Sequence, residues 1–141
     1  MKTWNNIGLS IATAGFCLLT FTSPTNAQST CKRTLDPDGR VSQVTWNTDS
    51  LVHVIRYHEN GKVREKGCYL AGKAHGRWVQ YDEQGHRTCR ARFDHGSRTG
   101  NWRMRTLEGN TLRLTYFENK LVRGEEFGPE GDLTAAQGVA R

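Results

Sequence analysis

The sequence has no long apolar run after its N-terminal segment, and it has only 3 prolines in 141 residues. A mean hydropathy of −0.70 excludes a protein with several membrane-spanning helices. A coiled coil is excluded because 15 glycines are too many for long helices. Low-complexity disorder is disfavoured because 4 Trp, 4 Tyr and 5 Phe supply apolar side chains that disordered chains lack. The composition favours one small folded domain.

The one long apolar segment lies at the N-terminus. Residues 1–27 combine a cation at Lys2, an apolar segment and small residues ending at Ala27, which predicts a secretory signal peptide cleaved after Ala27. The apolar segment is about 15 residues long, shorter than the roughly 20 of a spanning helix, and an uncleaved anchor is the alternative. A lipid anchor is disfavoured because Phe16 precedes Cys17. We expect an exported protein, periplasmic or secreted, that does not span the membrane.

A repeat of 24 residues dominates the rest of the chain. Glycines and aromatic residues fall into fixed columns when the sequence is aligned on itself at this offset. A fixed period in the range of about 20 to 50 residues is typical of a repeat architecture. The columns hold Gly61, Gly85 and Gly109; Gly76, Gly100 and Gly124; Trp78 and Trp102; and Tyr69, Phe93 and Phe117.

Each copy is predicted to be a β-hairpin, because short β-compatible runs alternate with glycine-rich turn segments. If residues 71–76 form the hairpin loop, Tyr69 lies opposite Trp78 on one face of the sheet, and Phe93 lies opposite Trp102. Such aromatic pairs contribute about 0.2–1 kcal/mol each. The expected fold class is all-β, with stacked antiparallel hairpins in a single sheet and an aromatic ladder on one face.

The copies diverge at both ends of the repeat region. We expect repeats over residues 57–131 and a leader with a divergent first hairpin over residues 28–56. Terminal repeats depart from the pattern because one side has no neighbour to pack against. Residues 132–141 lack periodicity and are expected to form a loose tail.

The chain is basic and has three cysteines after residue 27. It has 20 Lys and Arg against 14 Asp and Glu, and loss of residues 1–27 removes Lys2 and no acid, which leaves a net charge of +5. An oxidising compartment favours a disulfide bond. We expect Cys31 as one partner and prefer Cys89 to Cys68 as the other. A direct bond between Cys68 and Cys89 is not expected, because one strand would separate them by about 10 Å.

This pattern resembles the MORN (membrane occupation and recognition nexus) repeat family in its bacterial, antitoxin-like variant, over residues 57–131. The resemblance implies a twisted antiparallel meander that serves as a scaffold or binding surface without catalysis, and lipid binding is a further implication of it. Two features depart from the family pattern: Arg105 stands where the first copy has Tyr81, and a signal peptide does not suit an antitoxin of a cytoplasmic toxin. The resemblance rests on Tyr57, Gly61, Tyr69, Gly72, Gly76, Trp78, Tyr81, Gly85, Phe93, Gly96, Gly100, Trp102 and Gly109.

No catalytic or metal site is predicted. The sequence has no GxSxG motif, and Asp94, His95 and Ser97 are too close in sequence to converge as a catalytic triad. His75 and His95 invite a zinc site, but they occupy different places in the repeat and no compact ligand spacing accompanies them. We expect no enzyme activity, no cofactor and no bound metal.

Four cations are predicted to lie together on the face opposite the aromatic ladder. Such a patch favours an anionic partner, while a solvated face that keeps the sheet soluble explains the same charges. For an exported protein the anionic partner would be a lipid head group, an envelope polymer or an acidic protein, not nucleic acid. The four cations are Arg64, Lys66, Arg90 and Arg92.

Three classes of function stay open. The leading one is an exported, non-catalytic repeat protein that binds a partner, foremost a protein, across its sheet or serves as a scaffold. The second is a periplasmic immunity or antitoxin-like protein that neutralises a toxin. The third, a small envelope enzyme, has no supporting set of residues.

Overall fold

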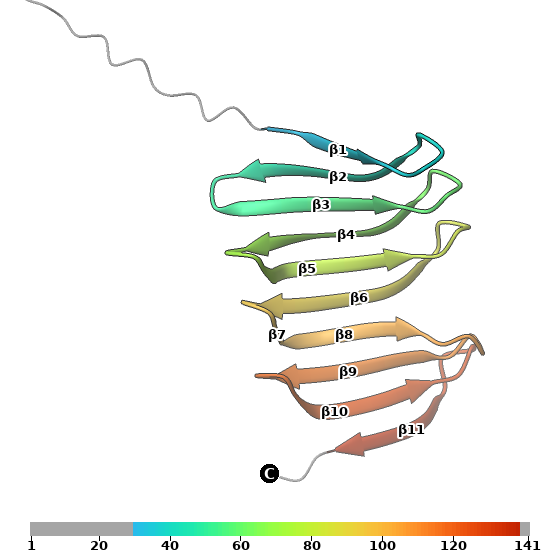
Figure 1. The fold of residues 1–141 in the computed structure, drawn as a ribbon. Helices are drawn as coiled ribbons and strands as arrows, with labels where there is room; N and C mark the ends of the chain where they lie inside the picture. Colours follow the sequence, from blue (N-terminus) through green and yellow to red (C-terminus); the bar gives the residue numbers. More distant parts are fainter. Residues whose placement is uncertain (1–29, 139–141) are drawn as a thin grey trace, which may run out of the picture.

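The computed structural model describes residues 30–138 as one antiparallel sheet of 11 strands. The strands follow one another in chain order, and only the short β7, which pairs with β6, lies off the main path (Figure 1). The expectation of an all-β fold with a single antiparallel sheet is confirmed, whereas the predicted signal peptide lies outside the described residues. The strands are β1 (Lys32–Leu35), β2 (Val41–Thr48), β3 (Leu51–Tyr57), β4 (Val63–Leu70), β5 (Lys73–Tyr81), β6 (Arg87–Asp94), β7 (Ser97–Arg98), β8 (Gly100–Arg105), β9 (Thr111–Phe117), β10 (Lys120–Phe127) and β11 (Leu133–Gly138).

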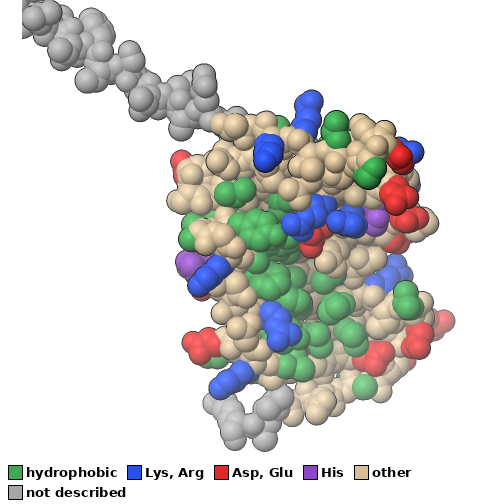
Figure 2. All heavy atoms as spheres, viewed as in Figure 1, with side chains coloured by type: hydrophobic (Ala, Val, Ile, Leu, Met, Phe, Trp, Pro, Cys, Tyr) green, Lys and Arg blue, Asp and Glu red, His purple; other side chains and the backbone are tan. Residues whose placement is uncertain are grey.

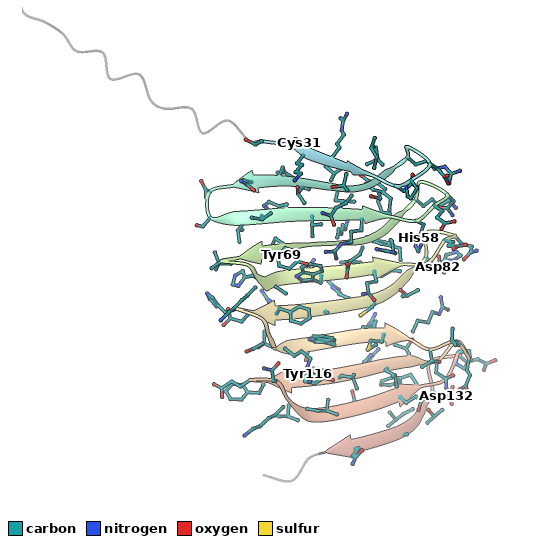
Figure 3. All side chains as sticks on the ribbon, in the orientation of Figure 1. Cys31, His58, Tyr69, Asp82, Tyr116 and Asp132 are labelled. Atoms are coloured by element: carbon teal, nitrogen blue, oxygen red, sulfur yellow. The ribbon has the colours of Figure 1, made fainter. Side chains whose placement is uncertain are left out.

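Five equivalent turns join the strands at one of their ends. In each turn a glycine N–H donates to the carbonyl three residues earlier, at 2.9–3.1 Å. Figure 3 shows His58, Asp82 and Asp132, from three of these turns, at the same side of the sheet. Side chains link neighbouring turns, since His58 Nε2 lies 2.9 Å from the Tyr81 carbonyl. The five glycines are Gly39, Gly61, Gly85, Gly109 and Gly131.

The turns at the other ends of the strands are shorter than expected. Leu70 pairs directly with Lys73, so Ala71 and Gly72 alone form the turn, both with positive φ. The loop predicted over residues 71–76 is therefore wrong. Turns with positive φ at both central residues match the right-handed twist of antiparallel strands, which a six-residue loop does not exploit.

A bulge beside each of the two repeat tryptophans explains the period of 24. Gly67 lies between the pairs Lys66–Val79 and Cys68–His75, so residues 76–78 of β5 face this single glycine of β4. The β2–β3 hairpin pairs without any such irregularity, and Gly39 precedes Gly61 by only 22 residues. The first hairpin is thus a regular member of the series that lacks the bulge.

The C-terminal segment also differs from the expectation. Residues Leu133–Gly138 form β11, which pairs with β10 from Phe127 to Arg123, so a loose tail is wrong for this part of the chain. All six residues of β11 are exposed, and the strand is held by backbone pairing with β10 and by a hydrogen bond from the Thr134 hydroxyl to the Glu126 carbonyl at 3.1 Å. Side-chain periodicity could not reveal it for this reason.

A thin core lies on one face of the sheet, which we call the aromatic face: Tyr69, Trp78, Phe93, Trp102 and Tyr116. Their rings form a continuous ladder with successive centroid distances of 5.0, 6.3, 5.0 and 5.1 Å. The face turned to the viewer in Figure 2 shows the corresponding band of hydrophobic side chains over the central strands. The expected contacts of Tyr69 with Trp78 and of Phe93 with Trp102 are present, although the register proposed to produce them is wrong.

The three described cysteines are free thiols, so the expected disulfide is not formed. Cys31 precedes β1 and Cys89 lies on β6, and four intervening strands separate them by roughly 24 Å, beyond the reach of a disulfide. Cys68 donates to the His75 carbonyl at 3.0 Å and lies on the face opposite Cys89. Burial raises the pKa of the Cys68 thiol.

Candidate functional site

The face opposite the aromatic ladder carries a row of cations, which we call the arginine face. Arg90 of β6 pairs with Arg103 of β8, and Arg103 pairs with Arg113 of β9. Two residues from Arg90 along the same strand, Arg92 of β6 pairs with Arg77 of β5. Three pairs of like charges are therefore directly opposite one another on adjacent strands, an arrangement that destabilises a sheet.

These five arginines surround an open groove of about 570 Å³. Gly100 and Ala91, whose side chain points to the opposite face, also line this groove, and Glu125 lines it from β10. The strands that carry these guanidinium groups are about 4.8 Å apart, so the positive charges gather on one surface.

Within residues 30–138, none of the five arginines makes an ion pair with an acidic side chain. Arg113 pairs with Glu125 in register and lies over the Phe127 ring at 4.2 Å. Glu125 in turn accepts a hydrogen bond from Arg123 at 2.6 Å. The positive charge of the groove is thus left uncompensated on its β5, β6 and β8 side.

The four predicted cations divide into two groups. Arg90 and Arg92 line the groove together. Lys66 lies on the same face but places its Nζ 5.6 Å from the centre of the Tyr81 ring. Arg64 lines a separate hollow with Tyr81 and Thr88.

Three arginines of the groove were missed by the sequence analysis: Arg77, Arg103 and Arg113. Arg77 directly precedes Trp78, and Arg103 directly follows Trp102, so strand alternation already places both on the face opposite the tryptophans. The positions of Arg77 and Arg103 beside the repeat tryptophans could therefore have predicted that both lie on the arginine face. Arg113 had no such marker, because its column in the repeat holds Cys89 in the preceding copy.

A polar cluster also interrupts the aromatic face. Arg56 binds Glu65 in a short ion pair and donates to the Tyr69 hydroxyl at 3.2 Å. The hydrogen bond that Arg56 donates to Tyr69 raises the pKa of Arg56; burial opposes this effect, and the interaction with Glu65 adds to it. Gln43 accepts a third hydrogen bond from Arg56 at 3.0 Å, so this cluster is internally satisfied and serves the packing of β2–β4.

The residues considered for catalysis do not assemble into a nucleophilic site. The Ser97 hydroxyl accepts a hydrogen bond from Asn119 at 3.3 Å, while Asp94 engages His95 at 2.7 Å. At the opposite turns, desolvation would raise the pKa of Asp82, but hydrogen bonds from His86 outweigh it and hold that pKa below its usual value. None of these groups faces the arginine groove.

Comparison with known proteins adds no relative. No protein-family model, no curated protein and no solved structure matches the sequence. Over the described part of the chain, no helix has the length and apolar character needed to cross a membrane.

Proposed function

We propose that this chain is an exported, non-catalytic binding module whose arginine face docks an acidic protein surface. The observation that carries the proposal is the groove with three directly opposed arginine pairs and five arginines without ion pairs. The MORN-like character of the repeat and export through a signal peptide are part of the same proposal.

The two faces of the sheet differ in their energetics. The aromatic face buries Trp78 and Ala91, which a single-layer sheet needs because no second layer covers it. The arginine face instead places like charges side by side, a cost of up to about 1 kcal/mol per pair that solubility alone does not require. Alternating charges would keep the sheet equally soluble. A binding function explains why the repulsive arrangement is present.

Carboxylates are the ligands that best fit this row. A guanidinium presents two parallel N–H donors to a carboxylate, and these charge-assisted bonds are stronger than neutral ones. Arg90, Arg103 and Arg113 occupy consecutive strands, so their backbones span about 10 Å. An acidic protein segment with several Asp or Glu side chains can engage all three at once.

The test is capture of partners from the envelope fraction of the source cell by the immobilised mature protein. An Arg90→Gln/Arg103→Gln double variant should lose the partner, and retention by the wild type should weaken as salt is raised. Arg33→Gln/Arg40→Gln is the matched control, because both of its arginines lie outside the groove. A partner retained equally by both double variants would contradict the proposal.

The nature of the captured molecule decides between the alternatives. An acidic protein supports the proposal, and an acidic toxin whose activity is blocked makes the chain an immunity-like protein. Capture of an anionic polymer or lipid instead, with the same dependence on Arg90 and Arg103, would replace the protein partner by an envelope component.

A further inference from the structure

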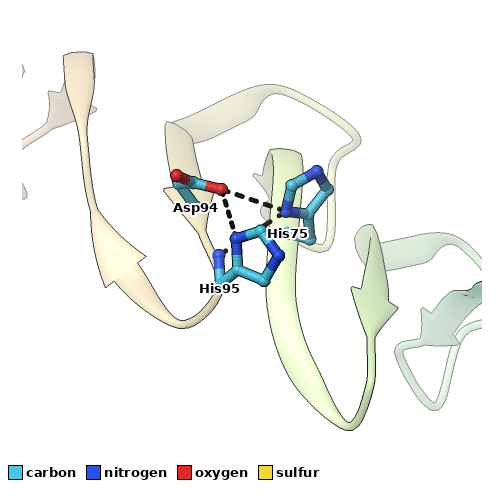
Figure 4. A group of neighbouring side chains, drawn as sticks. All are labelled: His75, Asp94 and His95. Carbon is cyan, nitrogen blue, oxygen red and sulfur yellow. Dashed lines mark hydrogen bonds and ion pairs between the residues drawn. The ribbon is translucent and has the colours of Figure 1, made fainter.

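Two histidines that the sequence places in different parts of the repeat meet at one end of the sheet. His75 lies on β5, while His95 belongs to the turn between β6 and β7, and their rings are 5.1 Å apart at an angle of 71° (Figure 4). Asp94 stands between them. The bulge at residues 76–78 and the two-residue turn at His95 together bring the two rings into contact. Alignment of the repeats at a constant offset of 24 residues does not show this contact.

Three potential ligand atoms converge in the cluster. Asp94 Oδ1 lies 3.4 Å from His75 Nδ1 and 2.7 Å from His95 Nδ1, and one potential ligand atom of each residue lies within 4.8 Å of the other two. Zinc at about 2.0–2.2 Å from such atoms separates its ligands by little more than 3 Å. Small side-chain rotations are therefore enough to form the site.

The hydrogen bonding leaves a lone pair directed into the cluster. A proton on His95 Nδ1 satisfies the 2.7 Å contact with Asp94. His75 Nδ1 then accepts only a long contact of 3.5 Å from the His95 backbone N–H, while it also faces the carboxylate. Two acceptors that face each other repel, and a cation between them removes the repulsion.

The backbone around the cluster is held in place. Gly96 N–H donates to the Ala74 carbonyl at 2.8 Å, which ties the His95 turn to the strand that carries His75. The side chains remain accessible, with exposed fractions of 31% for His75, 64% for Asp94 and 60% for His95. A metal ion can enter, and its remaining coordination positions face solvent.

We propose that His75, Asp94 and His95 form a site for a divalent transition-metal ion of the Zn²⁺ type, bound through two imidazole Nδ1 atoms and one carboxylate. Two nitrogens and one oxygen suit Zn²⁺, Ni²⁺ or Cu²⁺, whereas Ca²⁺ and Mg²⁺ require oxygen ligands. When the ion binds the Nδ1 atoms, the proton of the neutral His95 ring moves from Nδ1 to Nε2. The ion then links β5 to the β6–β7 turn. This site is independent of the arginine face and of the proposed partner.

The experiment is calorimetric titration of the full chain, prepared without a histidine tag, with ZnCl₂. We expect one Zn²⁺ per chain and a higher melting temperature when Zn²⁺ is present. His75→Ala and His95→Ala should each weaken binding by at least about tenfold. Asp94→Asn tests the carboxylate without removing side-chain volume.

His86→Ala is the matched control, because His86 forms a similar histidine–carboxylate contact with Asp82, at 3.3 Å, but no second histidine joins that pair. It should bind Zn²⁺ like the wild type. Thermal unfolding in EDTA establishes that each variant is folded. Equal affinity of wild type, His75→Ala and His95→Ala overturns the proposal, as does binding that disappears when the cysteines are alkylated, or equal binding of Mg²⁺.

Discussion

The indole ring of Trp78 lies directly against the backbone of Gly67 on the neighbouring strand. A Cβ atom at Gly67 would lie only 2.2 Å from Cδ2 of Trp78. Trp78 is 7% exposed and is held between Tyr69 and Phe93, so its ring has little room to move. Gly67 is therefore required by close packing and not by a turn.

The Gly67→Ala variant should lose about 1–3 kcal/mol of unfolding free energy, because the added methyl group forces Trp78 out of its place. Chemical denaturation measures this loss. Gly124→Ala is the matched control: Gly124 also lies within a strand, and its added Cβ would meet Leu114 at an ordinary 3.5 Å. Equal stability of the two variants would contradict the close packing of Trp78 over Gly67.

The two repeat tryptophans should differ in their contribution to stability. Trp78→Ala removes a buried ring at the centre of the core and should cost about 3–5 kcal/mol. Trp102→Ala should cost less, because Trp102 is only partly buried at the margin of the same cluster. Urea unfolding of both variants measures the difference. A larger loss of unfolding free energy for Trp102→Ala than for Trp78→Ala would contradict a core centred on Trp78 of β5.

Removal of Arg103 should stabilise the sheet, because Arg103 stands between Arg90 and Arg113. Arg103→Gln should raise the free energy of unfolding by about 0.2–1 kcal/mol at low salt, and the gain should shrink at high salt through screening. Arg64→Gln, which lies outside the groove, should leave stability unchanged. If Arg103→Gln destabilises the protein at low salt, the arginine pairs are not repulsive.

The three thiols should react at different rates. Cys31 is exposed, Cys68 is partly buried, and Cys89 is buried on the aromatic face. Burial raises the pKa of Cys68 and of Cys89, where Glu65 adds to the effect, so less of the reactive thiolate is present at neutral pH. Alkylation followed by peptide mass mapping should label Cys31 first and Cys89 last. Labelling of Cys89 as fast as Cys31 in the folded protein would contradict the burial of β6.

The sequence was sufficient to predict the sheet and the aromatic ladder, since these follow from the period of glycines and aromatics. It could not reveal the bulges, because the two residues that each inserts are already contained in the 24-residue period. The resulting register is what brings His75 to His95 and aligns Arg90 with Arg103. Strand β11 was missed because all six of its residues are exposed, so the sequence shows no alternation of apolar and polar residues there. Backbone hydrogen bonds to β10 do not depend on such a pattern.

The most direct test of the central claim is arginine footprinting of the complex captured from the envelope fraction. Phenylglyoxal modification followed by mass spectrometry reports how accessible each arginine is in the free and the bound chain. We predict strong protection of Arg90 and Arg103 in the complex, with Arg33 and Arg40 modified as in the free protein. Modification of Arg90 and Arg103 at the same rate in the complex as in the free chain would contradict a binding role for the arginine face.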